Sequence, residues 1–101
     1  MKAYRLSKEA QGDLEAIAHY IAVNASLERA VSVVSTIRAE ISRLGSNPGM
    51  GHFKEDVAGN ELKFWSVYKY LIAYRWDQKP IEIVAVVHGN RDLTAFFEGR
   101  K

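Results

Sequence analysis

Two stretches in the first half of the chain carry apolar residues at three- and four-residue spacing, which is the repeat of an α-helix with one apolar face. The apolar positions of the first stretch are Ala10, Leu14, Ile17, Ala18 and Ile21. Those of the second stretch are Ala30, Val33, Val34, Ile37, Ile41 and Leu44. We therefore expect two amphipathic helices, the first over residues 8–23, each with one face to bury.

Residues that cap or interrupt helices mark the ends of both stretches. Ser7 stands where the first helix needs an N-cap, and Asn24 or Ser26 stands there for the second. Gly45 is expected to end the second helix, and Pro48 prevents it from resuming. The link between the two helices is so short that they should form an antiparallel hairpin.

The second half of the chain changes to a two-residue alternation, which is the repeat of a β-strand. One strand is expected over residues 70–76 and a returning strand over residues 81–87. The polar segment 77–80 ends in proline and supplies the turn between them. A further strand candidate begins at Leu62, so this half of the chain should form an antiparallel sheet.

The expected register gives the sheet one uncharged face. With Trp76 opposite Ile81, Arg75 lies opposite Glu82, and these two side chains should form a cross-strand ion pair. The uncharged face then consists of Tyr70, Ile72, Tyr74, Trp76, Ile81, Ile83, Ala85 and Val87. Such a face must be buried, and the helical hairpin is available to cover it.

The opposite face of the sheet is expected to be apolar as well. Its members are Leu62, Phe64, Leu71, Ala73, Val84 and Val86. Either this face stays partly uncovered and marks a partner site, or Phe96 and Phe97 fold back over it. Residues 92–97 can form a short terminal helix or an extended segment.

A short strand over residues 3–6 precedes the helices, and a loop over residues 46–60 precedes the sheet. Long loops in compact domains are often functional. The order β-α-α-β-β-β predicts an α+β fold, with a helical hairpin packed on one face of a small, mostly antiparallel sheet. With a length of 101 residues, the chain is expected to form a single domain over residues 1–101.

Composition narrows the possible chemistry. The chain has no cysteine, so it cannot form a disulfide or a thiolate metal site. The histidines His19, His52 and His88 lack the spacing of metal ligands, and we expect no metal and no cofactor. The N-terminus lacks the apolar core of a signal peptide, and the aliphatic runs are too short to cross a bilayer. We therefore expect a cytoplasmic protein without membrane contact.

The net charge of +2 is evenly distributed along the chain. Residues 1–50 contain six Lys/Arg and five Asp/Glu, and residues 51–101 contain eight and seven. No basic block stands out, so we expect no direct and stable nucleic-acid binding. A basic patch that only the folded chain assembles stays open as an alternative.

A polar cluster follows the last expected strand. It consists of His88, Gly89, Asn90, Arg91 and Asp92. A glycine there permits backbone geometry closed to other residues, which suits side chains held together at the end of a strand. A purely structural interpretation is also open, in which Arg91 pairs with Asp92 and His88 caps a turn. No Ser/His/Asp triad, nucleophile elbow or phosphate-binding loop is present.

Several short motifs occur in an order and spacing that resemble one protein family. Near the N-terminus the chain reads Tyr4-x-Leu6-Ser7-x-x-Ala10-x-x-Asp13-Leu14. The middle contains Pro48-x-Met50-Gly51 and Tyr70-x-Ile72-x-Tyr74-Arg75. The end contains Ile81-Glu82-Ile83 and Val86-Val87-His88-Gly89-x-Arg91-Asp92. Together these motifs are similar to the ParE branch of the RelE/ParE superfamily, the toxins of type II toxin–antitoxin systems.

The resemblance implies a toxin that is neutralised by a cognate, ParD-like antitoxin, whose C-terminal segment wraps the helices and sheet. It also implies a target, because the ParE branch is known for poisoning DNA gyrase by protein–protein contact. On this interpretation the terminal segment 93–97 belongs to the contact surface. The candidate target- or partner-binding residues are Lys63, Arg75, His88, Arg91, Phe96 and Phe97.

Two alternatives to a gyrase poison stay open. RelE-type members cut messenger RNA on the ribosome without a metal, and in that case His88 and Arg91 would be the catalytic residues. That branch typically has arginine where Leu71 stands here, which favours the ParE branch. ParE-like sequences commonly have arginine where Lys63 stands, and lysine keeps the charge but loses the planar fork. The second alternative is an inactive toxin that only binds its antitoxin.

Overall fold

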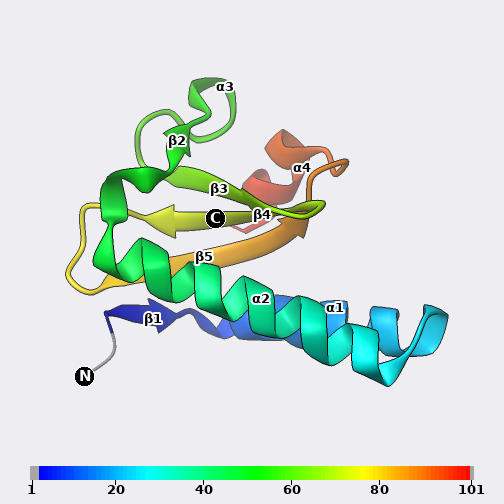
Figure 1. The fold of residues 1–101 in the computed structure, drawn as a ribbon. Coiled ribbons are helices and arrows are strands. Elements are labelled where there is room, and N and C mark those ends of the chain that lie inside the picture. The colour runs from blue at the N-terminus through cyan, green and yellow to red at the C-terminus, as the bar shows by residue number, and fades with distance from the viewer. Residues whose placement is uncertain (1–2, 101) are drawn as a thin grey trace.

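The protein is an α+β structure in which one five-stranded sheet has helices on both faces (Figure 1). The computed structural model describes residues 3–100. The helices are α1 (Lys8–Asn24), α2 (Leu27–Ser46), α3 (Glu55–Ala58) and α4 (Leu93–Glu98), with a 3₁₀ turn over Pro48–Met50. The strands are β1 (Tyr4–Leu6), β2 (His52–Phe53), β3 (Lys63–Val67), β4 (Tyr70–Arg75) and β5 (Ile81–His88).

The strands follow the order β1-β5-β4-β3-β2 across the sheet. β1 runs parallel to β5, and the other neighbouring strands are antiparallel. This arrangement confirms the expected α+β class, with a helical hairpin on one face of a mostly antiparallel sheet. The segment 46–60, expected to be a loop throughout, contains the short edge strand β2 and the single turn α3. None of the helices within residues 3–100 is long and apolar enough to cross a membrane.

Both long helices begin at the expected N-caps. The Oγ of Ser7 accepts a hydrogen bond from the amide of Ala10 at 3.0 Å, and the Oγ of Ser26 accepts one from Arg29, also at 3.0 Å. The expectation that Gly45 ends the second helix is wrong, because α2 continues through Ser46. The chain needs glycine there for another reason: a Cβ at Gly45 would lie 2.8 Å from the Cβ of Ala3.

The main core lies between the helical hairpin and one face of the sheet. It includes Leu14, Ile37, Ile41, Leu44, Ile72, Tyr74, Ile81, Ile83 and Val86, all buried. The apolar stripes of α1 and α2 therefore pack on the face that the register predicts, with one exception in β5.

A β-bulge in β5 changes which of its residues face the hairpin. Tyr74 pairs with Ile83 as expected, but Ala73 pairs with Ala85, so that Val84 has no partner in β4. An extra residue reverses the alternation that follows it. The assignments of Ala85 and Val87 to the hairpin face and of Val86 to the opposite face are therefore wrong, because the bulge exchanges them.

The opposite face of the sheet is covered by α3 and α4. Phe97 of α4 packs edge-to-face on Phe64, with ring centroids 5.8 Å apart, and Val57 of α3 packs against the same cluster. Leu62 is 7% exposed and Phe64 2%. Of the two alternatives left open by the sequence, the terminal phenylalanines therefore fold back over this face, and it does not stay uncovered.

Candidate functional site

Two turns meet at one end of the sheet and bring several candidate residues together. One turn joins β3 to β4 at residues 68–69, and the other joins β5 to α4 at residues 89–92. The amide of Gly89 donates a 2.7 Å hydrogen bond to the carbonyl of Lys69, which ties the turns to each other. Beside them, Tyr70 pairs with His88 across the strands, and their rings meet edge-to-face at 5.7 Å. We call residues 68–70 and 88–91 the double-turn surface.

His88 holds the second turn in shape. Its Nδ1 accepts a hydrogen bond from the amide of Asn90 at 3.1 Å, and its carbonyl accepts one from the amide of Arg91 at 3.0 Å. The expected pairing of Arg91 with Asp92 is wrong, because the carboxylate of Asp92 caps α4 by accepting from the amide of Ala95 at 3.1 Å. Capping by His88 is confirmed, and Arg91 is left free of any ion pair in residues 3–100.

Helix α4 presents its two phenylalanines to different neighbours. The Phe96 ring lies 5.0 Å from the guanidinium of Arg91 and 4.4 Å from that of Arg100, both in cation–π geometry. Phe97 contacts Phe96 at 5.0 Å and, on its other side, Phe64 of the sheet. Both rings are half-buried against the sheet, so only part of the surface of each ring is available to a partner.

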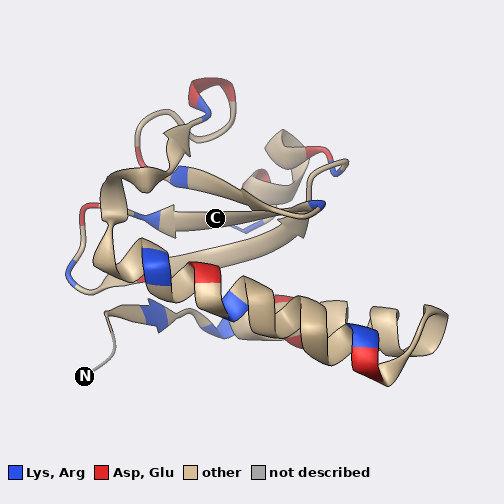
Figure 2. Ribbon diagram, in the orientation of Figure 1, with Lys and Arg blue, Asp and Glu red and all other residues tan. Residues whose placement is uncertain are grey.

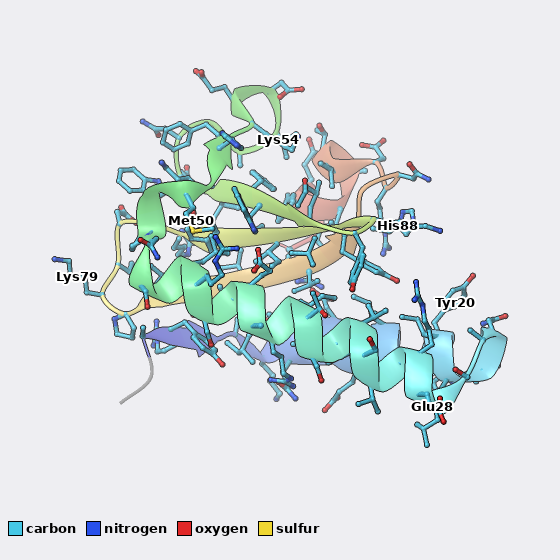
Figure 3. All side chains as sticks on the ribbon, in the orientation of Figure 1. Tyr20, Glu28, Met50, Lys54, Lys79 and His88 are labelled. Atoms are coloured by element: carbon cyan, nitrogen blue, oxygen red, sulfur yellow. The ribbon has the colours of Figure 1, made fainter. Side chains whose placement is uncertain are left out.

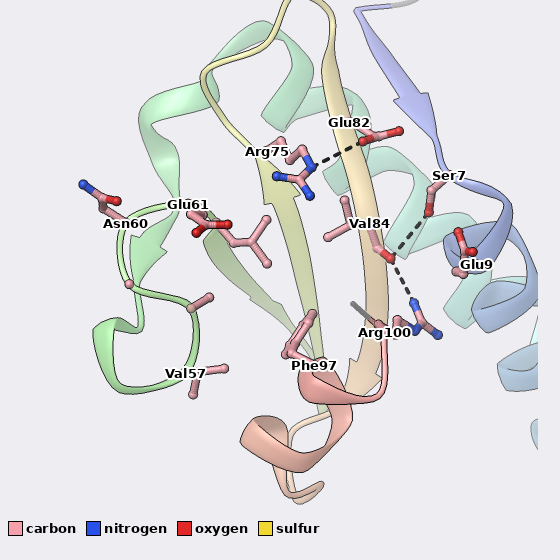
Figure 4. A pocket seen from close by; sticks show the side chains of 13 residues that line it. Ser7, Glu9, Val57, Asn60, Glu61, Arg75, Glu82, Val84, Phe97 and Arg100 are labelled. Atoms are coloured by element: carbon pink, nitrogen blue, oxygen red, sulfur yellow. Dashed lines mark hydrogen bonds and ion pairs between the residues drawn. The ribbon is translucent and has the colours of Figure 1, made fainter.

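Arg75 belongs to a groove on the α3/α4 side of the sheet (Figure 4). Its Nε lies 3.5 Å from a carboxylate oxygen of Glu82, which confirms the expected cross-strand ion pair. The groove has a volume of about 540 Å³ and is also lined by Glu9, Glu61 and Arg100. Glu9 and Glu61 have no polar side-chain partner among the described residues, so the groove has an excess of negative charge. Nowhere within residues 3–100 could three His, Asp or Glu side chains together hold a metal ion.

Lys63 lies apart from the other candidates, near the β2 edge of the sheet. Its Nζ lies 4.9 Å from the centroid of Phe53 and 5.5 Å from that of Trp76. Because Tyr74 points to the hairpin side and is the direct partner of Lys63, the neighbouring Arg75 projects from the opposite face. The six candidate residues therefore occupy three places: the β2 edge, the groove, and the end where the two turns meet α4. Phe97 of α4 also lines the groove.

A half-buried pair of polar side chains that sequence analysis missed, Asp13 and Arg100, holds the bulge of β5. Asp13 of α1 accepts a hydrogen bond from the amide of Val86 at 2.9 Å and forms an ion pair with Arg100 at 2.6 Å. Arg100 also donates to the carbonyl of Val84 at 2.9 Å. The only available signal was the place of Asp13 in the N-terminal motif, since Arg100 lies outside every motif.

Tyr74 explains the Pro48-x-Met50-Gly51 motif. Its buried hydroxyl donates to the carbonyl of Pro48 at 2.7 Å and accepts from the amide of Gly51 at 2.9 Å. A Cβ at Gly51 would lie 2.5 Å from this hydroxyl, so only glycine fits. Burial raises the pKa of Tyr74 above its usual value, although the hydrogen bond from Gly51 acts in the opposite direction.

Comparison with known proteins identifies the family of this chain by sequence and finds its fold in a solved structure. The family model described as the ParE toxin of the type II toxin–antitoxin system parDE matches residues 4–93. Toxin ParE1 of Caulobacter vibrioides is 30% identical over 95 residues, which cover 94% of this chain and 97% of that protein. A chain of the solved chromosomal ParDE system from P. aeruginosa superposes with a TM-score of 0.73 at 21% identity, over 87% of this chain and 96% of that chain. The chain belongs to the ParE toxin family, as the sequence motifs indicate.

Proposed function

We propose that this ParE-family toxin inhibits growth by binding DNA gyrase and stalling it with cleaved DNA, and that a cognate, ParD-like antitoxin neutralises it. Family membership supports a toxin and the antitoxin that accompanies it. The choice of gyrase over messenger RNA rests chiefly on the charge of the sheet face that carries α3 and α4.

That face is poorly suited to hold a scissile phosphate. Metal-independent RNA cleavage needs cations around the phosphate and a side chain that moves the proton of the 2′-hydroxyl. Leu71 instead packs into the apolar cluster beneath α4. The adjacent groove carries the unpaired carboxylates of Glu9 and Glu61, which would repel a nucleic-acid backbone.

His88 and Arg91 also point in different directions. The His88 ring faces Tyr70 on the hairpin side, whereas the guanidinium of Arg91 lies over Phe96 of α4. A nuclease would need both groups to converge on one phosphate. Their arrangement is better suited to separate contacts with a protein surface.

An antitoxin helix has a fitting site on the outer side of the hairpin. A shallow, mostly apolar groove of about 430 Å³ runs between α1 and α2, lined by Ala18, Leu27, Val31 and Val34 among others. Exposed apolar side chains continue at the tip of the hairpin: Tyr20, Val23, Leu27 and Val31. Amphipathic helices bind grooves of this kind.

The test compares the wild-type toxin with His88→Ala and Arg91→Ala in two reactions. One contains gyrase, ATP and relaxed plasmid, and the other contains translating ribosomes with a labelled message. We expect the wild type to give linear plasmid after detergent denaturation and an intact message, and Arg91→Ala to reduce the linear plasmid. A message cut by the wild type and spared by both folded variants would instead establish the nuclease.

A further inference from the structure

Tyr68 adopts a backbone conformation that tyrosine rarely takes. Val67 pairs with Tyr70, so Tyr68 and Lys69 form a two-residue turn between β3 and β4. The φ of Tyr68 is 55°, and it is the only non-glycine residue with positive φ in residues 3–100. A two-residue hairpin turn with positive φ at its first position alone is of the II′ kind, which normally requires glycine there. The tyrosine Cβ therefore strains the turn.

Packing does not compensate for this strain. Tyr68 is 59% exposed. Its hydroxyl reaches only the Oγ of Thr36, at a long 3.5 Å. A strained residue whose side chain stays in solvent points to a role outside the fold.

The surroundings of Tyr68 are cationic. Lys69 is exposed in the same turn, and the hydrogen bond from Gly89 brings the turn with Arg91 alongside. Figure 2 shows basic residues in both turns at this end of the sheet. Asp92, which follows Arg91 in the sequence, is engaged in capping α4. Neither Lys69 nor Arg91 forms an ion pair within the described part of the chain.

We propose that Tyr68, Lys69 and Arg91 of the double-turn surface form the contact by which this toxin binds its target, a protein surface with an apolar pocket beside carboxylates. Tyrosine and arginine dominate the energetics of protein interfaces. The two free cations are far fewer than the roughly 6–10 phosphate contacts of a typical DNA-binding site. The proposal deepens the proposed function, since it names the surface that meets gyrase.

The decisive variant is Tyr68→Gly, because it removes the ring and relieves the backbone at once. We expect its Tm to rise by about 4–8 °C, the shift that relief of strain at one residue with positive φ gives in a domain of this size. We expect growth arrest after induction of the variant to weaken at least about tenfold, the effect of losing an interface hot spot. Tyr68→Phe, which keeps the ring, should arrest growth as the wild type does.

Two lysine variants with the same change of charge test the contribution of Lys69. Lys69→Glu should weaken growth arrest, whereas Lys79→Glu should not, because Lys79 lies in the β4–β5 turn at the far end of the sheet from His88 (Figure 3). Full arrest by a folded Tyr68→Gly, or equal loss from both lysine variants, would overturn the proposal. A fall in the Tm of Tyr68→Gly would also overturn it, because Tyr68 would then serve the fold.

Growth arrest does not depend on which protein is the target, so the two proposals fail separately. If the wild type leaves gyrase unaffected in vitro, the gyrase assignment fails, while the variants in cells still decide the contact surface. A labelled short DNA duplex tests the choice of a protein partner. Salt-sensitive binding of that duplex by the wild type, lost in Lys69→Glu and retained in Lys79→Glu, would overturn that choice.

Discussion

Asp13 and Arg100 form an ion pair at 2.6 Å across 87 positions of the chain, and both also bond to the backbone of β5. β1 pairs with β5 only as far as Ile83. Beyond that point, Asp13 and Arg100 take over the hydrogen-bonding groups that a longer neighbouring strand would satisfy. The pair therefore joins the first helix, the bulge and the end of the chain into one unit.

Removing the carboxylate should destabilise this unit. Asp13→Ala leaves the amide of Val86 without its partner and Arg100 without its counter-charge, so we expect a loss of about 2–3 kcal/mol in the free energy of unfolding. Arg100→Ala should cost less, because Asp13 keeps its bond to Val86. Urea unfolding of both single variants and the double variant measures the coupling. Additive losses would show that the two side chains act independently.

Gly49 of the 3₁₀ turn and Gly51, which directly follows that turn, provide a matched pair. Gly51→Ala places a methyl group against the hydroxyl of Tyr74, and we expect a loss of about 1–3 kcal/mol from overpacking. Gly49→Ala has open space around the new Cβ and should change stability little. Equal effects on the urea midpoint would contradict the role given to Tyr74.

Tyr74 should make stability sensitive to alkaline pH. Its pKa is raised in the folded state, so its contribution is complete below the unfolded pKa of about 10 and is lost as the pH rises through the folded value. Tyr74→Phe should lose about 1–3 kcal/mol at neutral pH, because the amide of Gly51 loses its acceptor. The difference from the wild type should then shrink above about pH 10, as measured by unfolding at a series of pH values.

Glu40 should make the stability of the protein sensitive to acidic pH. The indole of Trp65 donates to its carboxylate at 2.9 Å, and this bond, together with Arg43, holds the pKa of Glu40 below its usual value. The stabilisation is present above the unfolded pKa of about 4.3 and is lost as the pH falls through the lower folded value. Glu40→Gln keeps an acceptor for Trp65 but does not titrate. Its stability, followed by Trp fluorescence, should fall less on acidification than that of the wild type, and parallel curves would contradict this.

The long helices were predictable because their apolar residues recur at the spacing of an α-helix. The three- and four-residue stripes gave α1 and α2, and Ser7 and Ser26 gave their starts. The bulge in β5 could not be predicted, because residues 83–87 are all aliphatic. Such a run shows no alternation of polar and apolar residues that would reveal where the alternation reverses. The elements β2 and α3 were missed because two and four residues are too few to show a period.

The residues of the candidate site also fall into those that the sequence predicted and those that it did not. The sequence pointed to His88 and Arg91 because a polar cluster followed a strand. It gave no sign of Tyr68, since a turn that needs glycine is the last place where an aromatic residue is expected. Arg100 was equally hidden, because only the folded chain brings the C-terminal segment to α1.

The most direct test of the central claim is DNA cleavage by gyrase in the presence of the purified toxin. Gyrase, ATP and relaxed plasmid are incubated with the protein and then denatured with detergent, beside a reaction with translating ribosomes and a labelled message. A gyrase poison should yield linear plasmid and leave the message intact. A cut message with normal supercoiling would contradict the account and would show that the protein is a messenger-RNA nuclease of the RelE type.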